Sequence, residues 1–375
     1  MGPSPGVVGY LESIVYGKRR GLIAGALRFL LVLLSEVYKA ALRLYLWPFE
    51  IGLREKQRLS RPVVSVGNIT VGGTGKTPTV QYLCRGMAGR GWNPAVLSYG
   101  YGGSLRGGFG IVSDKSGVRL TPELAGDEPV MLAGGMPGIP VLVCKDRGGS
   151  GRAAIGDLGA DVLLLDDGFQ VWKLYRDLDI VLLDAARPFD NGRTLPAGRL
   201  RESPTALKRA DCIIAAGACD PDSRENALAE IRKRIPATPV YFGRFSPSAL
   251  VSLTDRSELP VEAIRGRRVL ALSAVANPAS FEETLAAAGA MIVGSERLPD
   301  HHLYSDEDIE RVSESAVGND AEFIVTTEKD AVKLGGRSFV VPIAALHICL
   351  ELDDEPGFWE LVARRIGGPP KSGQG

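Results

Sequence analysis

The sequence lacks an excess of charge of one sign, a metal-type cysteine pattern and a long uncharged hydrophobic run. Lys and Arg together number 44, and so do Asp and Glu, so no overall field draws the chain toward nucleic acid. The five cysteines are odd in number and are not spaced as metal ligands, which favours reduced structural thiols in a cytosolic protein. At 375 residues, 45% of them hydrophobic, the chain is long enough for two domains, or for one large α/β domain with an appendage.

The missing uncharged run bears directly on the N-terminal region. Residues 22–47 are strongly apolar, but four charged residues interrupt them: Arg28, Glu36, Lys39 and Arg43. No uncharged stretch approaches the roughly 20 residues that a membrane span requires, and no small-residue cleavage site marks a signal peptide. At about 100° per residue, the four charges fall within an arc of about 80° on a helical wheel. We predict a helix that lies in a bilayer interface with its basic side toward anionic headgroups. The alternative is an amphipathic helix packed on its own domain.

Residues 63–77, VVSVGNITVGGTGKT, join a β-branched run to a glycine-rich turn that ends in Lys76 and Thr77. The backbone N–H groups of such a turn can hold phosphate oxygens, the lysine can reach the terminal phosphates, and the threonine hydroxyl can ligate magnesium. Thr70 stands where the usual pattern has glycine, and Gly72 and Gly73 can supply the permissive backbone instead. The turn predicts a nucleoside triphosphate site, the alternative being a flexible loop with an incidental lysine. The predicted phosphate-binding residues are Thr70, Val71, Gly72, Gly73, Thr74, Gly75, Lys76 and Thr77.

Strand and helix patterns alternate along the rest of the chain. Short apolar runs predict strands at 95–98, 139–143, 161–165, 180–184, 212–215, 269–273 and 323–326. Helices are predicted at 78–90, 151–158, 278–288, 306–317 and 357–365. This alternation favours mostly parallel sheets covered by helices on both faces. The Gly-, Pro- and Ser-rich tail, residues 367–375, is expected to be disordered.

Two acidic clusters stand out against this scaffold. Asp166 and Asp167 directly follow the apolar run VLLL. The carboxyl end of a strand is where an open α/β sheet binds ligands, and where nucleotide-hydrolysing folds place an acid near magnesium. The alternative is a solvated acidic turn. Asp127 and Glu128 occur in Gly-Asp-Glu-Pro, which taken alone indicates helix capping more often than catalysis.

A third cluster, Asp300-His301-His302, contains two of the three histidines in the chain. Such a pair is more often a surface or core feature, although an Asp beside a His also tunes a proton acceptor. Arg147 and Arg201 are basic counterparts, since arginine recognises phosphate through a planar fork, and their alternative role is a surface salt bridge. Spacing by itself does not rank these carboxylates.

The sequence resembles the tetraacyldisaccharide 4′-kinases, the lipid A kinases of Gram-negative bacteria. The similarity covers nearly the whole chain in consistent order, through GNITVGGTGKTP, LSYGYGG, GDEP, DDGFQ, RDLDIVLLDA, LPAGRLRE, DHHLYS and TTEKDAVKL. The resemblance implies an ATP-dependent transfer of phosphate to the 4′-hydroxyl of a tetraacylated glucosamine disaccharide 1-phosphate, which gives lipid IVA. It also implies attachment to the cytoplasmic face of the bacterial inner membrane through the N-terminal region, with no nucleic acid and no obligate protein partner.

The expected fold is a P-loop NTPase-like, mostly parallel α/β sheet flanked by helices, with a second, smaller α/β domain and an N-terminal amphipathic helix. The resemblance places the active site in the cleft between the two domains. The expected boundaries are 1–55 for the membrane-associating segment, 56–176 for the nucleotide-binding domain, 177–334 for the second domain and 367–375 for the tail. Residues 335–366 are expected to complete the nucleotide-binding domain.

The resemblance also implies roles for single residues, with ATP and Mg2+ as cofactors. Asp127 would accept the sugar hydroxyl proton with support from His301, and Lys76 would screen the phosphate charge. The residues implied to hold or orient magnesium are Thr77, Glu128, Asp166, Asp167 and Gln170. The residues implied to bind the disaccharide and its phosphate are Arg147, Arg201, Glu202 and Tyr101.

Two positions depart from the family pattern. Tyr99 stands where the family usually has arginine, and Val171 stands where it usually has histidine. Lys173 or Arg106 are candidates to compensate. A catalytically weakened lipid-binding homologue is therefore one alternative.

The other alternative is a membrane-associated P-loop nucleotide switch. A guanine-specific switch needs an Asn-Lys-x-Asp or Thr-Lys-x-Asp element. In the nearest stretch, residues 327–330, the lysine comes one place late.

Overall fold

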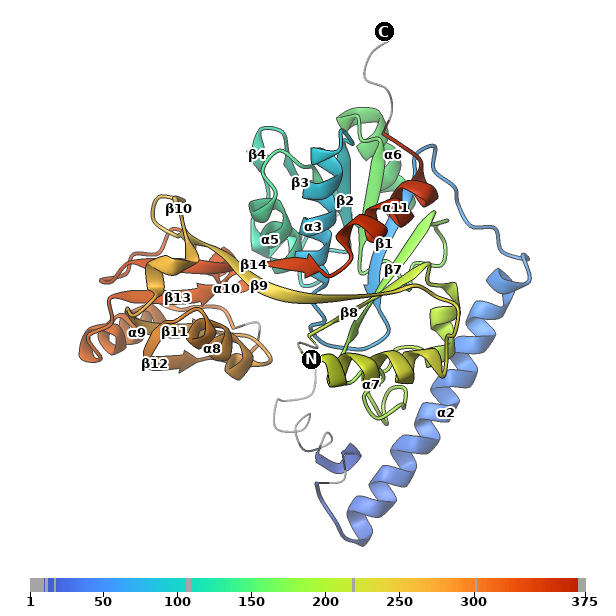
Figure 1. The fold of residues 1–375 in the computed structure, drawn as a ribbon, viewed down its shortest axis with the longest axis horizontal. Coiled ribbons are helices and arrows are strands. Elements are labelled where there is room, and N and C mark those ends of the chain that lie inside the picture. The colour runs from blue at the N-terminus through green and yellow to red at the C-terminus, as the bar shows by residue number, and fades with distance from the viewer. Residues whose placement is uncertain are drawn as a thin grey trace. The chain divides into compact units, whose positions relative to one another are not determined.

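The computed structural model describes Tyr10 and residues 13–16, 18–105, 109–217, 220–300 and 302–369 (Figure 1). Contacts divide the chain into two compact units. Unit 1 comprises Met1–Lys76, Asp167–Gly243 and Leu352–Gly367, and unit 2 comprises Thr77–Asp166, Arg244–Glu351 and Gly368–Gly375. The fold class expected from the sequence is confirmed, since most strands are parallel and helices flank them.

Unit 1 is built on a parallel sheet in the order β9-β8-β7-β1. Its strands are β1 (Val63–Asn68), β7 (Leu178–Asp184), β8 (Cys212–Ala216) and the beginning of β9 (Val240–Ser252). β1 pairs with β7 and β7 with β8, all in parallel. β1 and β8 are buried along their whole length, as expected for apolar strands covered on both faces. The helices of this unit are α2 (Leu22–Glu50), η1 (Pro204–Arg209), α7 (Pro221–Arg232) and α11 (Glu355–Ile366).

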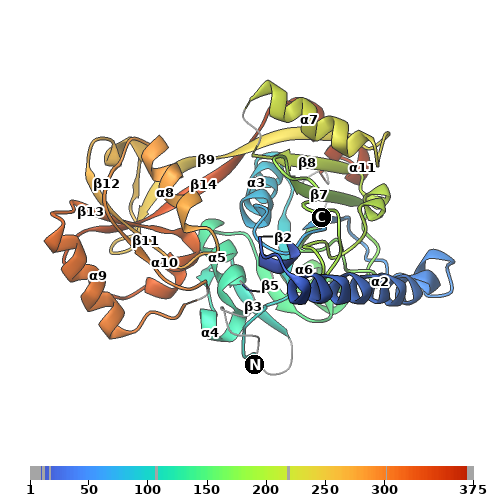
Figure 2. The same cartoon turned by 90° about the horizontal axis from the view of Figure 1, so that it is seen from below.

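Helix α2 packs on unit 1 through a face that mixes apolar and polar side chains, of which Ala24, Ser35, Leu46 and Phe49 are buried. The Ser35 hydroxyl donates to the Thr194 carbonyl at 2.9 Å, and the Tyr38 hydroxyl donates to the Arg201 carbonyl at 2.8 Å. Phe49 contacts Trp172 with ring centroids 6.3 Å apart. In Figure 2 the helix is seen on the side of β7 and β8 away from α7. For one face of the helix, the structure therefore agrees with the alternative prediction of an amphipathic helix packed on its own domain.

The opposite face of α2 is apolar and exposed. Leu22, Phe29 and Leu44 expose 94%, 73% and 72% of their surface. Counted at about 100° per residue, this arc lies opposite Ser35. Glu36 and Arg43 border the arc on one side, whereas Arg28 and Lys39 lie closer to Ser35. A helix of a water-soluble domain usually presents polar and charged residues on the face that is away from the core. No helix in the described part of the chain is both long enough and apolar enough to cross a membrane.

Unit 2 contains one group of strands in the order β6-β2-β5-β3-β4. They are β2 (Pro94–Ser98), β3 (Phe109–Asp114), β4 (Gly117–Val118), β5 (Val141–Cys144) and β6 (Val162–Asp166). β6, β2 and β5 are parallel, whereas β3 runs antiparallel to β5. The accompanying helices are α3 (Lys76–Gly89), α4 (Pro122–Ala125), α5 (Asp127–Gly135) and α6 (Arg147–Leu158).

A second group of strands in unit 2 follows the order β12-β11-β13-β14. They are β11 (Arg268–Ser273), β12 (Met291–Arg297), β13 (Phe323–Thr327) and β14 (Ile343–Leu352), all parallel, and β10 (Glu258–Leu259) pairs with β9. The helices are η2 (Val261–Ile264), α8 (Pro278–Ala287), α9 (Asp306–Gly318) and α10 (Glu328–Leu334). Side-chain caps fix several helix starts: Ser305 and Asp308 form a capping box at α9, and Thr327 caps α10.

The predicted strands and helices agree with the structure within about two residues at each end, with two exceptions. Helix α2 ends at Glu50 rather than at residue 47. Helix α6 begins at Arg147 rather than near residue 151. Gly-Gly-Ser at its start is a poor helical sequence, but the Asp146 side chain caps the helix by accepting the Gly148 N–H at 3.1 Å.

The predicted domain boundary at residue 177 separates strands that the structure pairs. β7 and β8 belong to the same parallel sheet as β1. The sequence pattern cannot show this, because a parallel strand far along the chain looks the same whichever sheet it joins.

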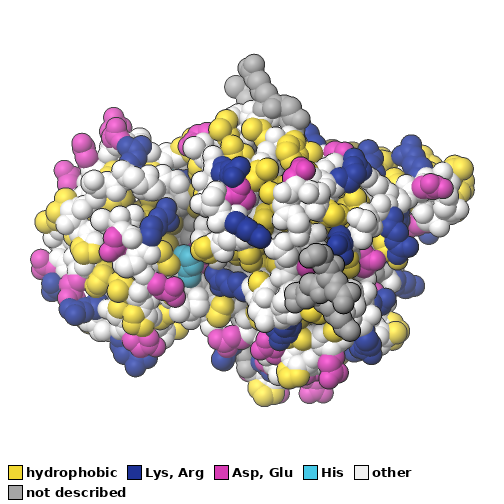
Figure 3. Space-filling model, turned by 90° about the horizontal axis from the view of Figure 1, so that it is seen from above, with side chains coloured by type: hydrophobic (Ala, Val, Ile, Leu, Met, Phe, Trp, Pro, Cys, Tyr) yellow, Lys and Arg dark blue, Asp and Glu magenta, His cyan; other side chains and the backbone are white. Residues whose placement is uncertain are grey.

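The exposed charges are mixed in sign. On the face shown in Figure 3, basic and acidic side chains are interspersed without a large patch of either sign. This distribution agrees with a chain in which 44 basic residues balance 44 acidic residues.

Candidate active site

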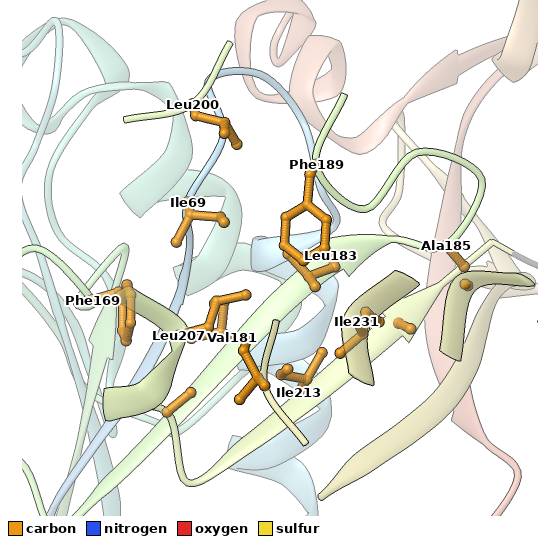
Figure 4. Close-up of a cluster of buried hydrophobic side chains, with 14 residues drawn as sticks. Ile69, Phe169, Val181, Leu183, Ala185, Phe189, Leu200, Leu207, Ile213 and Ile231 are labelled. Carbon is orange, nitrogen blue, oxygen red and sulfur yellow. The ribbon is translucent and has the colours of Figure 1, made fainter. Parts of the chain in front are cut away.

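The glycine-rich turn connects the end of β1 to the first residue of α3. An antiparallel bridge between Thr70 and Leu200 fixes its start. The Val71 N–H donates to the Arg199 carbonyl at 2.8 Å, and the Arg201 N–H donates to the Ile69 carbonyl at 2.7 Å. Ile69 and Leu200 belong to one buried hydrophobic cluster, shown in Figure 4 with Phe169. The segment that carries Arg201 is thereby attached to the turn itself.

Backbone geometry explains the glycines of the turn. Gly72 and Gly75 have φ of 109° and 78°, values that L side chains rarely adopt. At Gly72 an added Cβ would also lie 2.3 Å from the Arg199 guanidinium. The side-chain amide of Asn68 donates to the Thr74 hydroxyl at 2.8 Å and closes the turn from within. Thr70 needs no such freedom, because it lies in the bridge to Leu200.

Lys76, Asp167 and Arg201 form a charged cluster at this turn. The Lys76 ammonium lies 3.6 Å from Asp167 Oδ1, and the Arg201 guanidinium lies 2.8 Å from Asp167 Oδ2. Asp167 has a φ of 53°, an uncommon conformation for a residue other than glycine. Its Oδ1 is shielded from solvent and accepts no hydrogen bond from the described residues. Such an anionic oxygen is suited to a cation.

Gln170 and Glu202 lie beside this cluster in unit 1. The Gln170 amide nitrogen donates to the Asn68 carbonyl and to the Glu202 carboxylate, both at 3.0 Å. The Glu202 side chain is only 4% exposed and is paired with Arg209 at 3.0 Å. Burial raises the pKa of the nearby Tyr38 hydroxyl, and the negative charge of Glu202 raises it further.

Asp166 ends β6 in unit 2 and is buried. The Ser98 hydroxyl, at the end of the neighbouring strand β2, donates to Asp166 Oδ2 at 3.1 Å. Because the carboxyl ends of parallel strands meet at one edge of a sheet, the two side chains are brought together there. Asp166 thus lies at the carboxyl end of a strand, the position on which the prediction of a ligand-binding acid was based. Asp167 is the next residue and belongs to unit 1.

Asp127 is the first residue of α5, and Gly126 rather than Asp127 is the N-cap. The capping alternative therefore does not account for the Asp127 side chain, which instead lies 3.1 Å from the Lys333 ammonium of α10. The Lys333 side chain is 3% exposed. A buried lysine is costly unless it is paired, so this contact holds Asp127 in place. The sequence analysis quoted the motif that contains Lys333 but gave the lysine no role.

The Tyr101 turn packs on the beginning of α5. Gly126 has a φ of 92°, and a Cβ there would lie 2.4 Å from the Tyr101 carbonyl oxygen. The Tyr101 side chain itself is exposed. Arg147 is buried, donates to the Cys144 carbonyl at 2.8 Å, and lies 5.6 Å from the centre of the Tyr99 ring. Tyr99, one of the two departures from the family pattern, is thus in contact with a predicted substrate-binding arginine.

Several predicted residues are not joined to these clusters. His301 and Arg106 lie outside the described residues. His302 pairs with Asp308 at 2.8 Å, and Asp300 pairs with Lys329 at 2.7 Å. Glu128 and Lys173 are exposed, and the backbone carbonyl of Val171 accepts a hydrogen bond from Arg176.

A magnesium site needs oxygen donors that lie close together. Within the described ranges, no three His, Cys, Asp or Glu side chains are gathered closely enough to hold a metal ion. The Oδ1 of Asp167 in unit 1, which accepts no hydrogen bond from the described residues, is nevertheless a hard oxygen donor of the kind that magnesium prefers. This oxygen fits a magnesium ion that protein ligands hold only in part, as such ions usually retain water and phosphate ligands.

A hollow of about 600 Å³ opens beside the turn in unit 1. Its walls include Thr70 and Gly73 of the turn, together with Lys18, Arg187 and Asp190. The Tyr16 hydroxyl donates to Asp190. The hollow is polar and contains both signs of charge, as a site for a sugar with a phosphate requires.

Comparison with known proteins gives a consistent result. A family model described as tetraacyldisaccharide-1-P 4′-kinase matches residues 27–367. A protein of Pelobacter propionicus named tetraacyldisaccharide 4′-kinase is 43% identical over 327 residues, which are 87% of this chain and 89% of the relative. A protein of the same name from Syntrophus aciditrophicus is 43% identical over 314 residues, 81% of this chain and 84% of the relative.

A solved structure is also similar. It is the "apo" form of LpxK from Aquifex aeolicus in complex with ATP, which matches with a TM-score of 0.75 and 30% identity over 91% of this chain and 99% of that chain. This chain is similar to these proteins in sequence and in fold over most of its length. It therefore belongs to the tetraacyldisaccharide-1-phosphate 4′-kinase family.

Proposed function

We propose that this chain transfers the γ-phosphoryl group of ATP to the 4′-hydroxyl of a tetraacylated glucosamine disaccharide 1-phosphate, giving lipid IVA. The observation that carries the proposal is the cluster of Lys76, Asp167 and Arg201 at a glycine-rich turn. A bond forms between the sugar oxygen and the γ-phosphorus, and the bond from that phosphorus to the β–γ bridging oxygen breaks. ADP leaves, and the hydroxyl proton passes to a base. The names of the relatives and the ATP bound by the similar structure support this assignment.

The turn and its cluster would position the triphosphate. The Lys76 ammonium and backbone N–H groups within residues 70–77 would hold the negatively charged phosphates. Arg201 is held between Asp167 and the turn by its side chain and its backbone. It would therefore orient the acceptor or its phosphate with little freedom left to lose on binding. Glu202, Arg147 and Tyr101 would complete the contacts to the disaccharide.

Asp127 would be the base that accepts the hydroxyl proton. Its carboxylate is fixed by the buried Lys333, so it does not need to be ordered when the substrate binds. His301 would support it, as the family resemblance implies.

Magnesium would be held by Asp167, Asp166 and Thr77, with Glu128 and Gln170 orienting its water ligands. When bound, the ion neutralises charge on the β- and γ-phosphate oxygens. Asp167 contacts both Lys76 and Arg201, so its carboxylate holds the two cations at the turn where the phosphates would bind.

Helix α2 would attach the enzyme to the cytoplasmic face of the inner membrane as a peripheral, monotopic protein. Its exposed apolar arc suits the acyl region of a bilayer leaflet, and the bordering charges suit the headgroups. Lys18 precedes this helix and lines the hollow beside the turn. The sugar headgroup of a lipid substrate would enter that hollow while its acyl chains remain along α2.

The proposal is tested by incubating the full chain with labelled ATP, Mg2+ and the tetraacyl disaccharide 1-phosphate. Labelled lipid is the expected result. ATP hydrolysis that does not depend on the lipid would indicate a nucleotide switch instead, and no turnover at all would indicate a weakened lipid-binding homologue. Asp127→Ala should lower kcat by about 100-fold or more while ATP affinity stays nearly constant. Normal turnover in that variant would remove the assignment of the base.

A further inference from the structure

Arg209 is a partly buried arginine in unit 1 to which neither the sequence pattern nor the family resemblance gave a role. It is the last residue of η1. Its guanidinium carbon lies 4.4 Å from the centre of the Phe169 ring and 4.1 Å from that of Trp172. Its Nη2 lies 3.2 Å and 3.0 Å from the two carboxylate oxygens of Glu202. Two aromatic rings and one carboxylate therefore define a single orientation of this side chain.

The partner of Arg209 is almost completely enclosed. A buried carboxylate is stable only when its oxygens are paired, and Glu202 receives donors from Arg209 and Gln170. Desolvation lowers the pKa of Arg209, and the charge of Glu202 opposes that shift. The two charges thus support each other in a site that excludes most water.

The orientation of the Gln170 amide follows from this pair. Its nitrogen faces two groups, the Asn68 carbonyl and the Glu202 carboxylate, each 3.0 Å away. An amide carbonyl and an ionised carboxylate can only accept hydrogen bonds, so the nitrogen of Gln170 must be the atom that faces them. The Gln170 oxygen then faces the other way, toward the Arg201 guanidinium at 3.5 Å.

We propose that Arg209 is a positioning residue for phosphoryl transfer, which acts by holding Glu202 so that Gln170 presents its oxygen toward Arg201. The proposal rests on the proposed function, because Gln170, Glu202 and Arg201 are assigned to the site there. Arg209 itself touches neither the turn nor the charged cluster among the described contacts. Its effect passes through two hydrogen-bonded neighbours.

An arginine suits this position better than a lysine. Its planar guanidinium stacks on Phe169 and Trp172 while the edge reaches the carboxylate, whereas an ammonium is more strongly hydrated and does not stack. Trp172 in turn packs on Phe49 of α2, within a small buried cluster. The packing that holds Arg209 against Glu202 therefore reaches α2, the helix that carries the exposed apolar face.

Arg209→Met is the first test, since methionine fills the space without the charge. We expect kcat for lipid phosphorylation to fall about 10- to 100-fold, as for other residues that orient site ligands through a neighbour. KM for ATP should change little, because the turn is untouched. Arg209→Lys keeps the charge and should recover part of kcat. If Arg209→Met does not fold, Arg209→Lys alone still tests the proposal, and a kcat equal to that of the wild type would then overturn it.

A double-mutant cycle separates positioning from general structural support. If Arg209 acts through Glu202, then Arg209→Met combined with Glu202→Gln should lower kcat no more than the worse single variant does. Losses that multiply would overturn the proposal. Arg232→Met is the control, because Arg232 lies in α7 and supports the carbonyls of Pro236 and Thr238. It should lower the melting temperature without changing kcat measured well below that temperature.

Lipid phosphorylation by the wild type distinguishes a failure of this inference from a failure of the proposed function. If the wild type does not phosphorylate the disaccharide lipid, the proposed function fails. If the wild type is active and the kcat of Arg209→Met stays within about twofold of the wild-type value, only the inference about Arg209 fails.

Discussion

At the scale of single residues, charged side chains in this protein gain their roles from specific partners. Asp167 lies between Lys76 and Arg201, and Asp127 lies against Lys333. None of these pairs is adjacent in sequence. The cysteines show the same dependence on surroundings, because burial raises the pKa of the Cys84 and Cys212 thiols well above the usual value. Both are unreactive structural thiols, as the sequence composition indicates.

Asp308 gives a prediction for the pH dependence of stability. Hydrogen bonds from His302, the Ser305 backbone and Arg311 hold the pKa of its carboxyl below the usual range. A carboxyl whose pKa is depressed in the folded state stabilises the protein above its unfolded pKa of about 3.9, and this contribution fades as the pH falls below that value. Asp308→Asn should therefore lower the melting temperature near neutral pH, and the difference from the wild type should shrink toward about pH 3.

Thermal unfolding at several pH values measures this difference. Asp306→Asn is a suitable control, since the Asp306 carboxylate is mostly exposed and is paired with Arg337 at the surface. A deficit in the Asp308→Asn variant that stays constant from pH 7 to about pH 3 would contradict the linkage.

At the scale of elements, the start of helix α5 depends on the close contact between Gly126, its N-cap, and the turn that contains Tyr101. Gly126→Ala should lower the free energy of unfolding by more than about 1 kcal/mol, because of the positive φ and because the new Cβ would clash with the Tyr101 carbonyl oxygen. Gly134→Ala is a matched control in the same helix, since a Cβ there meets no atom within 4 Å. It should be neutral or should stabilise the helix by up to about 1 kcal/mol. Denaturant titration measures the free energy of unfolding of the two variants. Equal changes would show that the contact between residue 126 and the Tyr101 carbonyl oxygen does not restrict position 126 to glycine.

Helix α2 gives a second prediction at this scale. Replacing Phe29 and Leu44 by Ser should weaken binding to vesicles of phosphatidylethanolamine and phosphatidylglycerol about tenfold or more, because each large apolar side chain contributes roughly 1.5–3 kcal/mol when buried. The melting temperature should change little, since both residues are largely exposed. Met291→Ser with Val340→Ser removes two exposed apolar side chains from unit 2 and serves as the control. Vesicle flotation measures the binding, and unchanged flotation of the Phe29 and Leu44 variant would reject α2 as the membrane contact.

At the scale of the whole molecule, binding of a triphosphate should stabilise the fold. ATP with Mg2+ should raise the melting temperature in a concentration-dependent way, by an amount equivalent to about 2.7 kcal/mol at a concentration of about 100 times Kd. Lys76→Ala should lose most of this shift, because the Lys76 ammonium belongs to the charged cluster at the turn and is expected to contact the terminal phosphates. AMP, which lacks those phosphates, is the control ligand. A full shift in the Lys76→Ala variant would place the triphosphate elsewhere.

Local patterns predicted a large part of the fold. The predicted strands and most of the predicted helices follow from neighbouring residues, so their ranges agree with the structure. Other elements were not predicted, among them strands β3, β9, β12 and β14 and helices α7 and α10. Gly243, Arg244 and Pro247 interrupt the pattern of β9, and β14 mixes small, polar and apolar residues. The start of α6 was also misplaced, since a single capping side chain compensates for a poor helical sequence.

The sequence by itself determined the glycine-rich turn, the alternation of strands and helices and the family. These depend on residues close together in the chain, where spacing reflects backbone geometry directly. Only the tertiary structure decided that Lys333 contacts Asp127, that Arg209 supports Glu202, and that α2 packs on unit 1 through Ser35 and Tyr38 while its apolar face remains exposed. Each of these contacts joins segments far apart in the chain, and their partners are selected by packing and by the need to pair buried charge, which no local pattern encodes.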